Sequence, residues 1–380
     1  MAAMEKNNKT LNVPNLRFPE FSGEWEKTRF ENVVSLQRGS SPRPIIEYIT
    51  KSSDGVNWVK IGDMPKYGRL VTSTEEKITK EGAKKSRRVN VGDLILSNSM
   101  SYGQPYIMNI DGYIHDGWFV LKNFEKSFDR DYLCNLLISP AVQNQYRRLA
   151  AGGVVQNISS DLVNSVIISL PSIKEQQKIA SVLNIIDDRI ATQRKVIEKY
   201  ESLIRGLCEN LTRQGTANKT IDECLECHSS TLQESAVLDV GRYPVYGATG
   251  VCGYTDAPEA SGDGILIIKD GASVGVTYFA NGSYSSIGTL NRLTAKEGIN
   301  LRYAYYCLKV MNFAPFKTGL AIPHIYFKDY GKHKIWCPPL EQQSRIADAL
   351  TNIDNMIHIE KSLLEQLNSQ KRYVLNQLFI

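Results

Sequence analysis

The sequence lacks any long hydrophobic stretch. No apolar run in its 380 residues approaches the roughly 18 to 20 residues that a membrane-spanning helix requires. The N-terminal segment MAAMEKNNKTLNVPNLRFPEF has no apolar core either, so it does not resemble a secretory signal, and we interpret it as a loose polar lead-in. We therefore expect a cytoplasmic protein that makes no contact with a membrane.

Cysteine and histidine are both scarce. The seven cysteines are odd in number and widely spaced, which argues against a disulfide framework and fits a reducing compartment. The five histidines include no pair with metal-ligand spacing. The formal net charge is only +5, which permits nucleic-acid binding without indicating it.

The common catalytic motifs are missing as well. GATGVCGYT, from Gly247, has the glycines of a phosphate-binding P-loop but not its lysine. There is no H-E-x-x-H motif and no Asp/Asn-Pro-Pro-aromatic run of an amino-methylating enzyme. We therefore expect a non-catalytic protein with no cofactor of its own. The alternative is an unrecognised nuclease, for which the nearest residues are Asp263, Lys269 and Asp270.

One short motif raises the question of a cofactor. Cys224-Leu-Glu-Cys227-His228 fits the C-x-x-C-H pattern of covalent haem attachment, and zinc binding is a second possibility. A third interpretation is that both cysteines are small apolar core residues. An internal repeat favours this third interpretation, because it aligns Cys224 with Val33 and Cys227 with Leu36.

This repeat is the main feature that the chain does contain. The segment 152–211 aligns without a gap with the segment 319–378, and 15 of the 60 aligned pairs are identical. The β-prone regions correspond more loosely, for example FENVVSL from Phe30 with IDECLEC from Ile221. Two copies are too few for a solenoid. They indicate one molecule with internal pseudo-symmetry that presents two similar parts to two similar partners.

Each copy ends in a long helical pattern. Apolar residues alternate by four and three positions, as in a coiled coil, and one polar position is matched between the copies. The predicted seam residues are Ile179, Leu183, Ile186, Ile190, Gln193 and Ile197 in the first helix and Ile346, Leu350, Ile353, Ile357, Glu360 and Leu364 in the second. Helices of about 35 to 40 residues are roughly 50 to 60 Å long. We expect them to pair antiparallel, with Gln193 close to Glu360. The alternative is that each helix packs only on its own domain.

The repeat predicts an α+β fold in five parts. Two regions are rich in short strand-like runs broken by Gly, Asn, Asp and Ser, and prolines separate these regions from the helices. The predicted boundaries are a lead-in at 1–24, β-rich regions at 25–170 and 214–337, and helices at 171–213 and 338–380.

Each β-rich region holds polar residues that are candidates for ligand contact. The first contains a compact basic loop able to neutralise phosphates, formed by Lys84, Lys85, Arg87 and Arg88. It also has a polar group at the end of an apolar strand, suited to base edges, formed by Asn98, Ser99, Ser101, Tyr102 and Gln104. The candidates in the second region are Lys269, Ser273, Asn291, Arg292, Lys317 and His324. A role in a turn or cap is the alternative for each.

The chain resembles the specificity subunit of type I restriction–modification systems. LPSIKEQQKIA from Leu170 and CPPLEQQSRIA from Cys337 look like the repeated helix start of that family. LQRGSSPRP from Leu36 and GDLILSNSMSYGQPYI from Gly92 resemble one type of its target-recognition domain. YPVYGATGVCGY from Tyr243, with IKDGASVGV, resembles another.

The resemblance implies two target-recognition domains separated by two long antiparallel helices that form a coiled coil. Each domain would read one half-site in double-stranded DNA, and half-sites on one face of the DNA would lie about 34 to 36 Å apart. Two methyltransferase subunits would dock on the pseudo-equivalent surfaces, and restriction subunits would join them. S-adenosylmethionine, Mg and ATP would bind those partners only. A coiled-coil adaptor that does not bind DNA is a further alternative.

Overall fold

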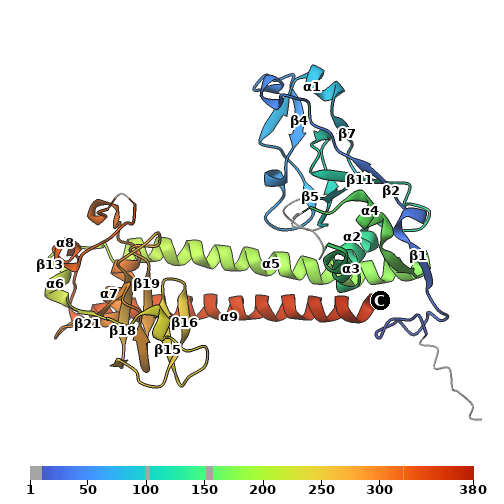
Figure 1. The fold of residues 1–380 in the computed structure, drawn as a ribbon. Coiled ribbons are helices and arrows are strands. Elements are labelled where there is room, and N and C mark those ends of the chain that lie inside the picture. The colour runs from blue at the N-terminus through green and yellow to red at the C-terminus, as the bar shows by residue number, and fades with distance from the viewer. Residues whose placement is uncertain (1–10, 99–102, 151–156, 320) are drawn as a thin grey trace, which may run out of the picture. The chain divides into compact units, whose positions relative to one another are not determined.

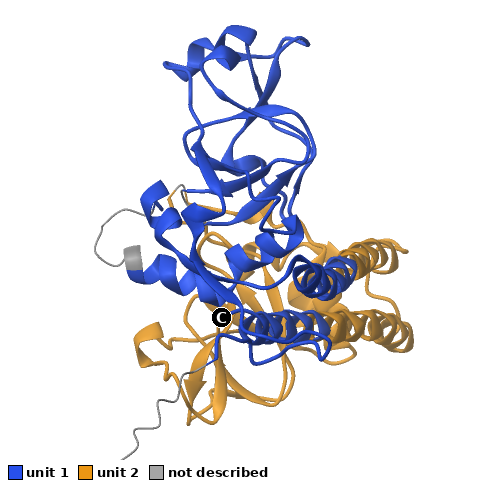
Figure 2. Ribbon diagram, turned by 90° about the vertical axis from the view of Figure 1, so that its right-hand side faces the viewer, with its two compact units in different colours: residues 1–194, 363–380 blue, residues 195–362 orange. Residues whose placement is uncertain are grey.

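The computed structural model describes residues 11–98, 103–150, 157–319 and 321–380. The chain divides into two compact units (Figure 2): unit 1 comprises residues 1–194 and 363–380, and unit 2 comprises residues 195–362. The long helices α5 (Ile173–Leu211) and α9 (Leu340–Leu378), drawn in Figure 1, each contribute one part to either unit. Within the described ranges, no helix is both long and apolar enough to cross a membrane.

The described part of unit 1 contains three sheets. A small sheet pairs β1 with β12 antiparallel, and two five-stranded sheets have the orders β2-β11-β8-β9-β5 and β3-β6-β4-β10-β7. The strands are β1 (Glu26–Arg29), β2 (Ser35–Arg38), β3 (Ile49–Thr50), β4 (Val56–Val59), β5 (Leu70–Val71), β6 (Glu76–Ile78), β7 (Arg87–Val89), β8 (Leu94–Ser97), β9 (Pro105–Met108), β10 (Gly112–Ile114), β11 (Trp118–Lys122) and β12 (Ile167–Leu170). The shorter helices are α1 (Lys80–Lys84), α2 (Arg130–Ile138), α3 (Pro140–Ala150) and α4 (Ser160–Ser165).

Both faces of the sheet β2-β11-β8-β9-β5 are buried. Successive side chains of a strand point to opposite faces. Leu94 and Leu96 therefore join a core with α2 and the start of α5, whereas Ile95 joins a second core that includes strands of the other large sheet. The last turn of α9 packs into the first of these cores through Leu378.

Unit 2 repeats this plan with smaller sheets. In its described part, two four-stranded sheets have the orders β14-β21-β18-β19 and β16-β15-β20-β17, and β13 pairs with β22. The strands are β13 (Lys219–Thr220), β14 (Leu225–Ser229), β15 (Tyr243–Gly247), β16 (Gly250–Thr255), β17 (Ala260–Ser261), β18 (Gly264–Ile268), β19 (Thr277–Ala280), β20 (Ser283–Ser286), β21 (Leu290–Ala295) and β22 (Lys334–Ile335). The helices are α6 (Ile221–Cys224), α7 (Leu301–Lys309) and α8 (Phe327–Tyr330). Alternate residues of β18 again face two cores, Ile267 toward α7 and Leu266 toward the second sheet.

The paired parts of α5 and α9 run antiparallel. In unit 1, Lys371 of α9 donates a hydrogen bond to Asp187 of α5. In unit 2, Lys361 of α9 forms an ion pair with Glu201 of α5 at 2.6 Å. Increasing residue numbers on α5 thus meet decreasing numbers on α9. The predicted α+β fold with an antiparallel helical pair is confirmed.

The predicted seam residues differ in burial. Those that are at most 9 % exposed are Ile179, Leu183, Ile186, Ile190, Gln193, Ile197, Ile346, Leu350 and Ile357. Those that are half-buried are Ile353, Glu360 and Leu364. The alternative that each helix packs only on its own domain is wrong, because in unit 1 α5 packs on the core of its own unit and also contacts α9. The closeness of Gln193 to Glu360 remains a prediction.

The prediction of a loose lead-in is wrong for residues 11–24. Arg17 forms a two-pronged ion pair with the buried carboxylate of Glu175, at 2.8 and 2.9 Å. The backbone N–H of Leu16 donates to Gln377 O at 3.0 Å, near the end of α9. The polar composition of this segment concealed its role, because the charge that it contributes neutralises a buried acid 158 residues away.

Candidate nucleic-acid interface

One buried glutamine holds the start of α5 against the β-rich part of unit 1. The Gln176 side chain is fully buried. Its Oε1 accepts from the Asp129 N–H at 2.9 Å, and its Nε2 donates to Ser127 O at 2.8 Å and to Pro171 O at 3.0 Å. Asp129 is itself the N-cap of α2, accepting from Tyr132 N at 3.0 Å. The glutamine therefore fixes the position of α2 relative to α5.

Unit 2 contains the same arrangement at the aligned position of the repeat. Gln343 is 1 % exposed; its Oε1 accepts from Asn300 N at 2.8 Å, and its Nε2 donates to Pro338 O at 2.8 Å. Asn300 caps α7 by accepting from Tyr303 N at 3.0 Å. The two E-Q-Q runs are therefore offset by one position: the equivalent residues are Gln176 and Gln343, whereas Gln177 and Gln342 are exposed.

The repeat also accounts for the cysteine motif. Cys224 is fully buried in the main core of unit 2, and Cys227 is half-buried and packs against that core. Burial raises the pKa of the Cys224 thiol to about 12 and that of Cys227 to about 11. These are the small apolar roles that the alignment with Val33 and Leu36 predicts. Among the described residues, no three His, Cys, Asp or Glu side chains gather as a metal site.

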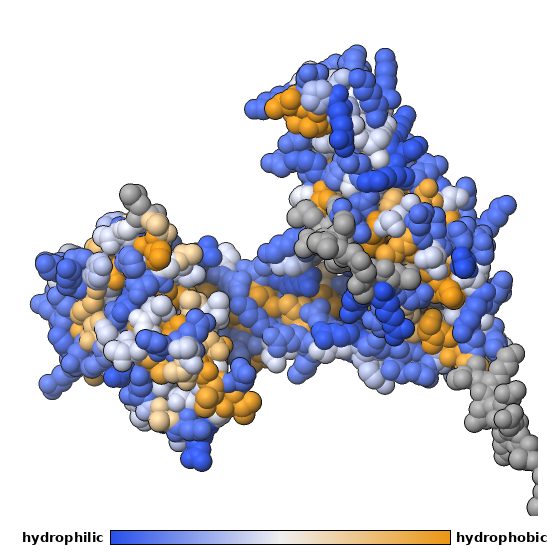
Figure 3. Space-filling view, in the orientation of Figure 1, coloured by the Kyte–Doolittle hydropathy of each residue, from blue (hydrophilic) through white to orange (hydrophobic). Residues whose placement is uncertain are grey.

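The prediction of a basic loop is wrong for most of this segment of unit 1: Lys84 ends α1, Arg87 and Arg88 begin β7, and Lys85 lies in the turn between them. Thr79 caps α1 by accepting from Gly82 N at 3.1 Å, and β7 pairs antiparallel with β10. This arrangement leaves all four predicted cations exposed, namely Lys84, Lys85, Arg87 and Arg88. The surface that carries α1 and β7 is mostly hydrophilic (Figure 3).

Neighbouring groups hold part of this basic surface in place. Lys85 Nζ lies 4.7 Å from the centre of the Tyr48 ring, and Arg88 lies 3.8 Å from Asp111. Exposed pairs of this kind contribute little to stability. The cations therefore remain accessible to an anionic partner.

The polar group at the end of β8 is only partly described. Asn98 is 5 % exposed, and its side-chain N–H donates to Asp116 O at 2.9 Å. Its amide is thus used inside unit 1. Gln104 pairs through its backbone with Ser97. The remaining members lie outside the described residues; they are Ser99, Ser101 and Tyr102.

Four of the candidates in unit 2 lie around the end of β18, and only two of them are exposed. His324 Nδ1 lies 2.6 Å from Asp270 Oδ1, and the backbone of Lys269 accepts from Ile325 N at 2.9 Å. Ser273 and Lys317 are exposed. Asp263 and Asp270 lie at opposite ends of the five-residue strand β18, which is roughly 17 Å long. The carboxylates considered for a nuclease therefore do not converge.

The last two candidates occupy opposite faces of β21. Asn291 is 5 % exposed and accepts from Ser229 Oγ at 3.1 Å. Arg292 is half-buried and faces a cleft of about 160 Å³ on the side of the second sheet.

A pair of acidic residues that sequence reasoning missed joins each β-rich region to the helices. Asp187 contacts Arg69 at 3.1 Å as well as Lys371, and Asp354, its counterpart in the repeat, contacts Lys309 at 3.0 Å. Burial alone would lower the pKa of Lys309, but Tyr305 and Asp354 outweigh it and raise the pKa. The sequence did contain a signal for this pair, because Asp187 and Asp354 are identical residues at aligned positions of the repeat.

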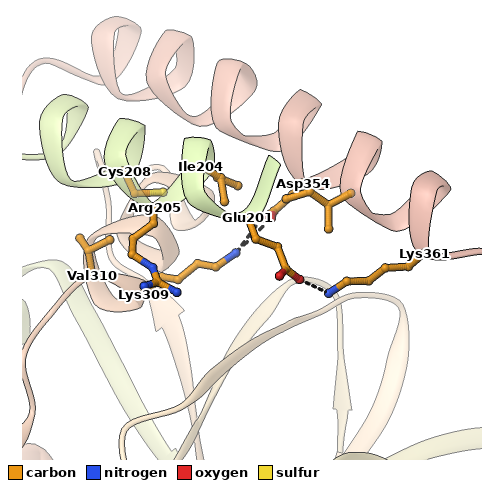
Figure 4. Close-up of a pocket in the computed structure, with 9 residues that line it drawn as sticks. Glu201, Ile204, Arg205, Cys208, Lys309, Val310, Asp354 and Lys361 are labelled. Carbon is orange, nitrogen blue, oxygen red and sulfur yellow. Dashed lines mark hydrogen bonds and ion pairs between the residues drawn. The ribbon is translucent and has the colours of Figure 1, made fainter. Parts of the chain in front are cut away.

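The second of these acids borders a pocket of about 450 Å³ in unit 2 (Figure 4). Two ion pairs cross the region, Lys309 with Asp354 and Lys361 with Glu201. These two lysines are thus neutralised by carboxylates of α5 and α9.

These units and helices define a duplicated scaffold, in which each of two β-rich regions is attached to a pair of long helices. Two successive segments, residues 22–201 and 215–369, match the family described as type I restriction modification DNA specificity domain. The matches span most of the chain, which therefore belongs to this family.

Known relatives agree with this assignment. The chain is 21 % identical over 359 residues to the type I restriction enzyme EcoprrI specificity subunit of Escherichia coli, covering 88 % of each chain. It is 22 % identical over 418 residues to the putative type I restriction enzyme MjaX specificity subunit of Methanocaldococcus jannaschii, covering 97 % and 96 %. The crystal structure of a type I restriction-modification S subunit from M. genitalium has the same fold, with a TM-score of 0.63, 18 % identity and coverage of 97 % and 99 %.

Proposed function

We propose that this chain is the DNA specificity subunit of a type I restriction–modification complex and reads a bipartite, asymmetric DNA site. The observation that carries this proposal is the division between what is copied and what has diverged. Gln176 and Gln343 make the same contacts in both units, and Asp187 has its counterpart in Asp354. The β-rich regions that these residues anchor differ in strand number and in sequence. Two β-rich regions that are attached to the helices in the same way but differ from each other suit a scaffold that recognises two different half-sites.

The copied helices suggest two equivalent docking places. We propose that two methyltransferase subunits dock there and that restriction subunits join them in the cytoplasm. S-adenosylmethionine, Mg and ATP then bind those subunits, and this chain carries out no chemistry itself. A solved structure with a TM-score of 0.58 and 18 % identity comes from work on complex assembly of the type I R-M system, which supports a role within an assembly.

In unit 1, we propose that the basic surface on α1 and β7 contacts DNA phosphates. Each true phosphate contact contributes about one to the slope of log affinity against log salt. Changing Lys84 or Arg87 to Ala should therefore weaken binding to all sequences almost equally and lower this slope by about one. An unchanged slope would remove the changed residue from the interface.

Methylation mapping tests the function directly. DNA from cells that express this chain with its neighbouring methyltransferase should carry a split methylated motif with a fixed gap. Replacing residues 25–170 with those of another family member should change one half of that motif only. A change in both halves would contradict the proposal that each β-rich region recognises one half-site independently. Absence of a split motif would contradict the proposed function.

The adaptor alternative makes the opposite prediction. A coiled-coil adaptor would not bind DNA even when a methyltransferase subunit is present. Sequence-specific binding by the reconstituted complex in a gel-shift assay therefore separates the two functions.

A further inference from the structure

A polar cleft in unit 2 has a cation that the equivalent position of unit 1 lacks. It lies between the sheets that contain β21 and β20 and has a volume of about 160 Å³. Its lining includes Ser230, Glu259, Tyr284, Ser285, Ser286 and Arg292. Most of these side chains are polar, although the neighbouring positions of the same strands belong to an apolar core.

Arg292 is not required by the shared fold. Leu36 and Cys227 are equivalent in the repeat, and they pair in register with Leu121 and Leu293 respectively. The residue before each of these partners is Val120 in unit 1 and Arg292 in unit 2. Val120 is fully buried in an apolar core. Unit 2 therefore has a cation, Arg292, at the position where unit 1 has the buried Val120.

The cleft offers unused hydrogen-bond donors around this cation. Among the described residues, no carboxylate lies within ion-pair distance of Arg292. Ser285 Oγ accepts from Glu259 N at 2.9 Å, which leaves its own hydroxyl proton free. Ser286 is 5 % exposed, and its hydroxyl has no partner in the described structure.

Tyr284 adds a further hydroxyl beside Arg292. Its side chain is 1 % exposed and lines the cleft, and its hydroxyl lies beside the Arg292 side chain without a well-formed hydrogen bond among the described residues. Buried hydroxyl groups normally have a hydrogen-bond partner. Gly264 of β18, in the facing sheet, makes room for this hydroxyl, because a Cβ there would clash with the oxygen. Burial raises the pKa of Tyr284, and the nearby charge of Arg292 opposes that rise.

The chemistry of this set favours an anion with several acceptor oxygens. A guanidinium and hydroxyl donors are typical partners of phosphate. Glu259 is the carboxylate of the lining, and it is exposed and already accepts from Ser230 Oγ at 2.8 Å. We propose that this cleft binds a phosphate of the DNA backbone, with Arg292 as its charged contact. The proposal rests on the proposed function and assigns one DNA-facing surface of unit 2.

The test measures the salt dependence of DNA binding by the full chain reconstituted with its methyltransferase subunit. Arg292→Gln should lower the slope of log affinity against log salt by about one, so that the ratio of wild-type to variant affinity changes about 3.5-fold between roughly 50 and 200 mM salt. Arg292→Lys should retain most of the slope, because it keeps the charge. Arg345→Gln is the matched control, because the Arg345 side chain is 78 % exposed on α9 and its loss removes the same charge. This variant should leave the slope unchanged. All three variants should have the same melting temperature as the wild-type protein.

Each contrary result has a distinct meaning. If the complex with the wild-type chain binds no DNA, the proposed function fails. If wild type binds and Arg292→Gln has the same slope and affinity, only the phosphate site fails. If Arg292→Gln alters one position of the methylated motif, Arg292 reads a base instead. Saturable binding of inorganic phosphate that Arg292→Gln abolishes, with no change in the DNA slope, would assign the cleft to free phosphate and overturn the proposal.

Discussion

Replacing Gln176 with Leu should destabilise unit 1 far more than the same change one residue later. Leucine has a similar volume but removes three hydrogen bonds, to Asp129 N, Ser127 O and Pro171 O. A hydrogen bond contributes about 1 kcal/mol net, and a buried group left without a partner costs about 1–3 kcal/mol. Two of these bonds are only partly buried, so we expect a loss of about 2–4 kcal/mol.

Gln177 provides the matched control, because it is exposed and lies in the same turn of α5. Gln177→Leu should change the free energy of unfolding by less than about 0.5 kcal/mol. Denaturant unfolding measures both changes, and hydrogen exchange locates them. Exchange of the amides of α2, including Tyr132, should accelerate in Gln176→Leu, whereas the amides of α7 should not.

Unit 2 allows the same comparison with a different pair. Gln343→Leu should accelerate exchange in α7, and Gln342→Leu should not. If Gln176→Leu and Gln177→Leu unfold within about 0.5 kcal/mol of each other, or if exchange rises equally in both units, the glutamine is not the anchor that its hydrogen bonds indicate.

Three further changes test the packing. Arg17→Met leaves the buried Glu175 without its partner and should cost about 3–5 kcal/mol in urea unfolding, and a loss below about 1 kcal/mol would contradict the buried pair. Ile190→Asp places a charge in the helical seam at a position 5 % exposed and should prevent normal melting and complex assembly; wild-type behaviour in both assays would refute the seam. At about pH 8, an alkylating reagent followed by mass spectrometry should label the exposed Cys252 first, while Cys224, whose pKa is raised to about 12 by burial, reacts only after unfolding; equal labelling would place Cys224 outside the core.

The sequence predicted the helices because their signals are local and repeated. Heptad spacing places Ile179 and Ile346 at matching positions, and the two patterns reinforce each other across the repeat. The helices extend over Ile173–Leu211 and Leu340–Leu378, and the prolines of each copy precede them. An apolar stripe on a long helix needs a partner, so the antiparallel pairing also followed.

The polar contacts could not be predicted in the same way, because their partners are distant in sequence. Asn98 reads as a base-contacting residue after an apolar strand, yet its amide bonds to Asp116 O, 18 residues on. Arg17 and Glu175 are 158 residues apart. Composition and periodicity report which residues lie in the core, but they do not report which polar group satisfies another.

The two anchoring aspartates show how such a scaffold can change its readers. Asp187 and Asp354 are identical in the repeat, but their cations come from unrelated places, Arg69 just before β5 and Lys309 at the end of α7. The helix thus keeps its acid, and each β-rich region supplies its own cation. A transplanted β-rich region should bring such a cation with it: without Arg69, the half-buried Asp187 keeps its ion pair with Lys371 but loses its contact with the β-rich region. An exchange of residues 25–170 replaces Arg69 together with its β-rich region, so the incoming region supplies its own cation and should function. A shorter exchange that ends before residue 69 would combine a foreign β-rich region with the Arg69 contact of this chain.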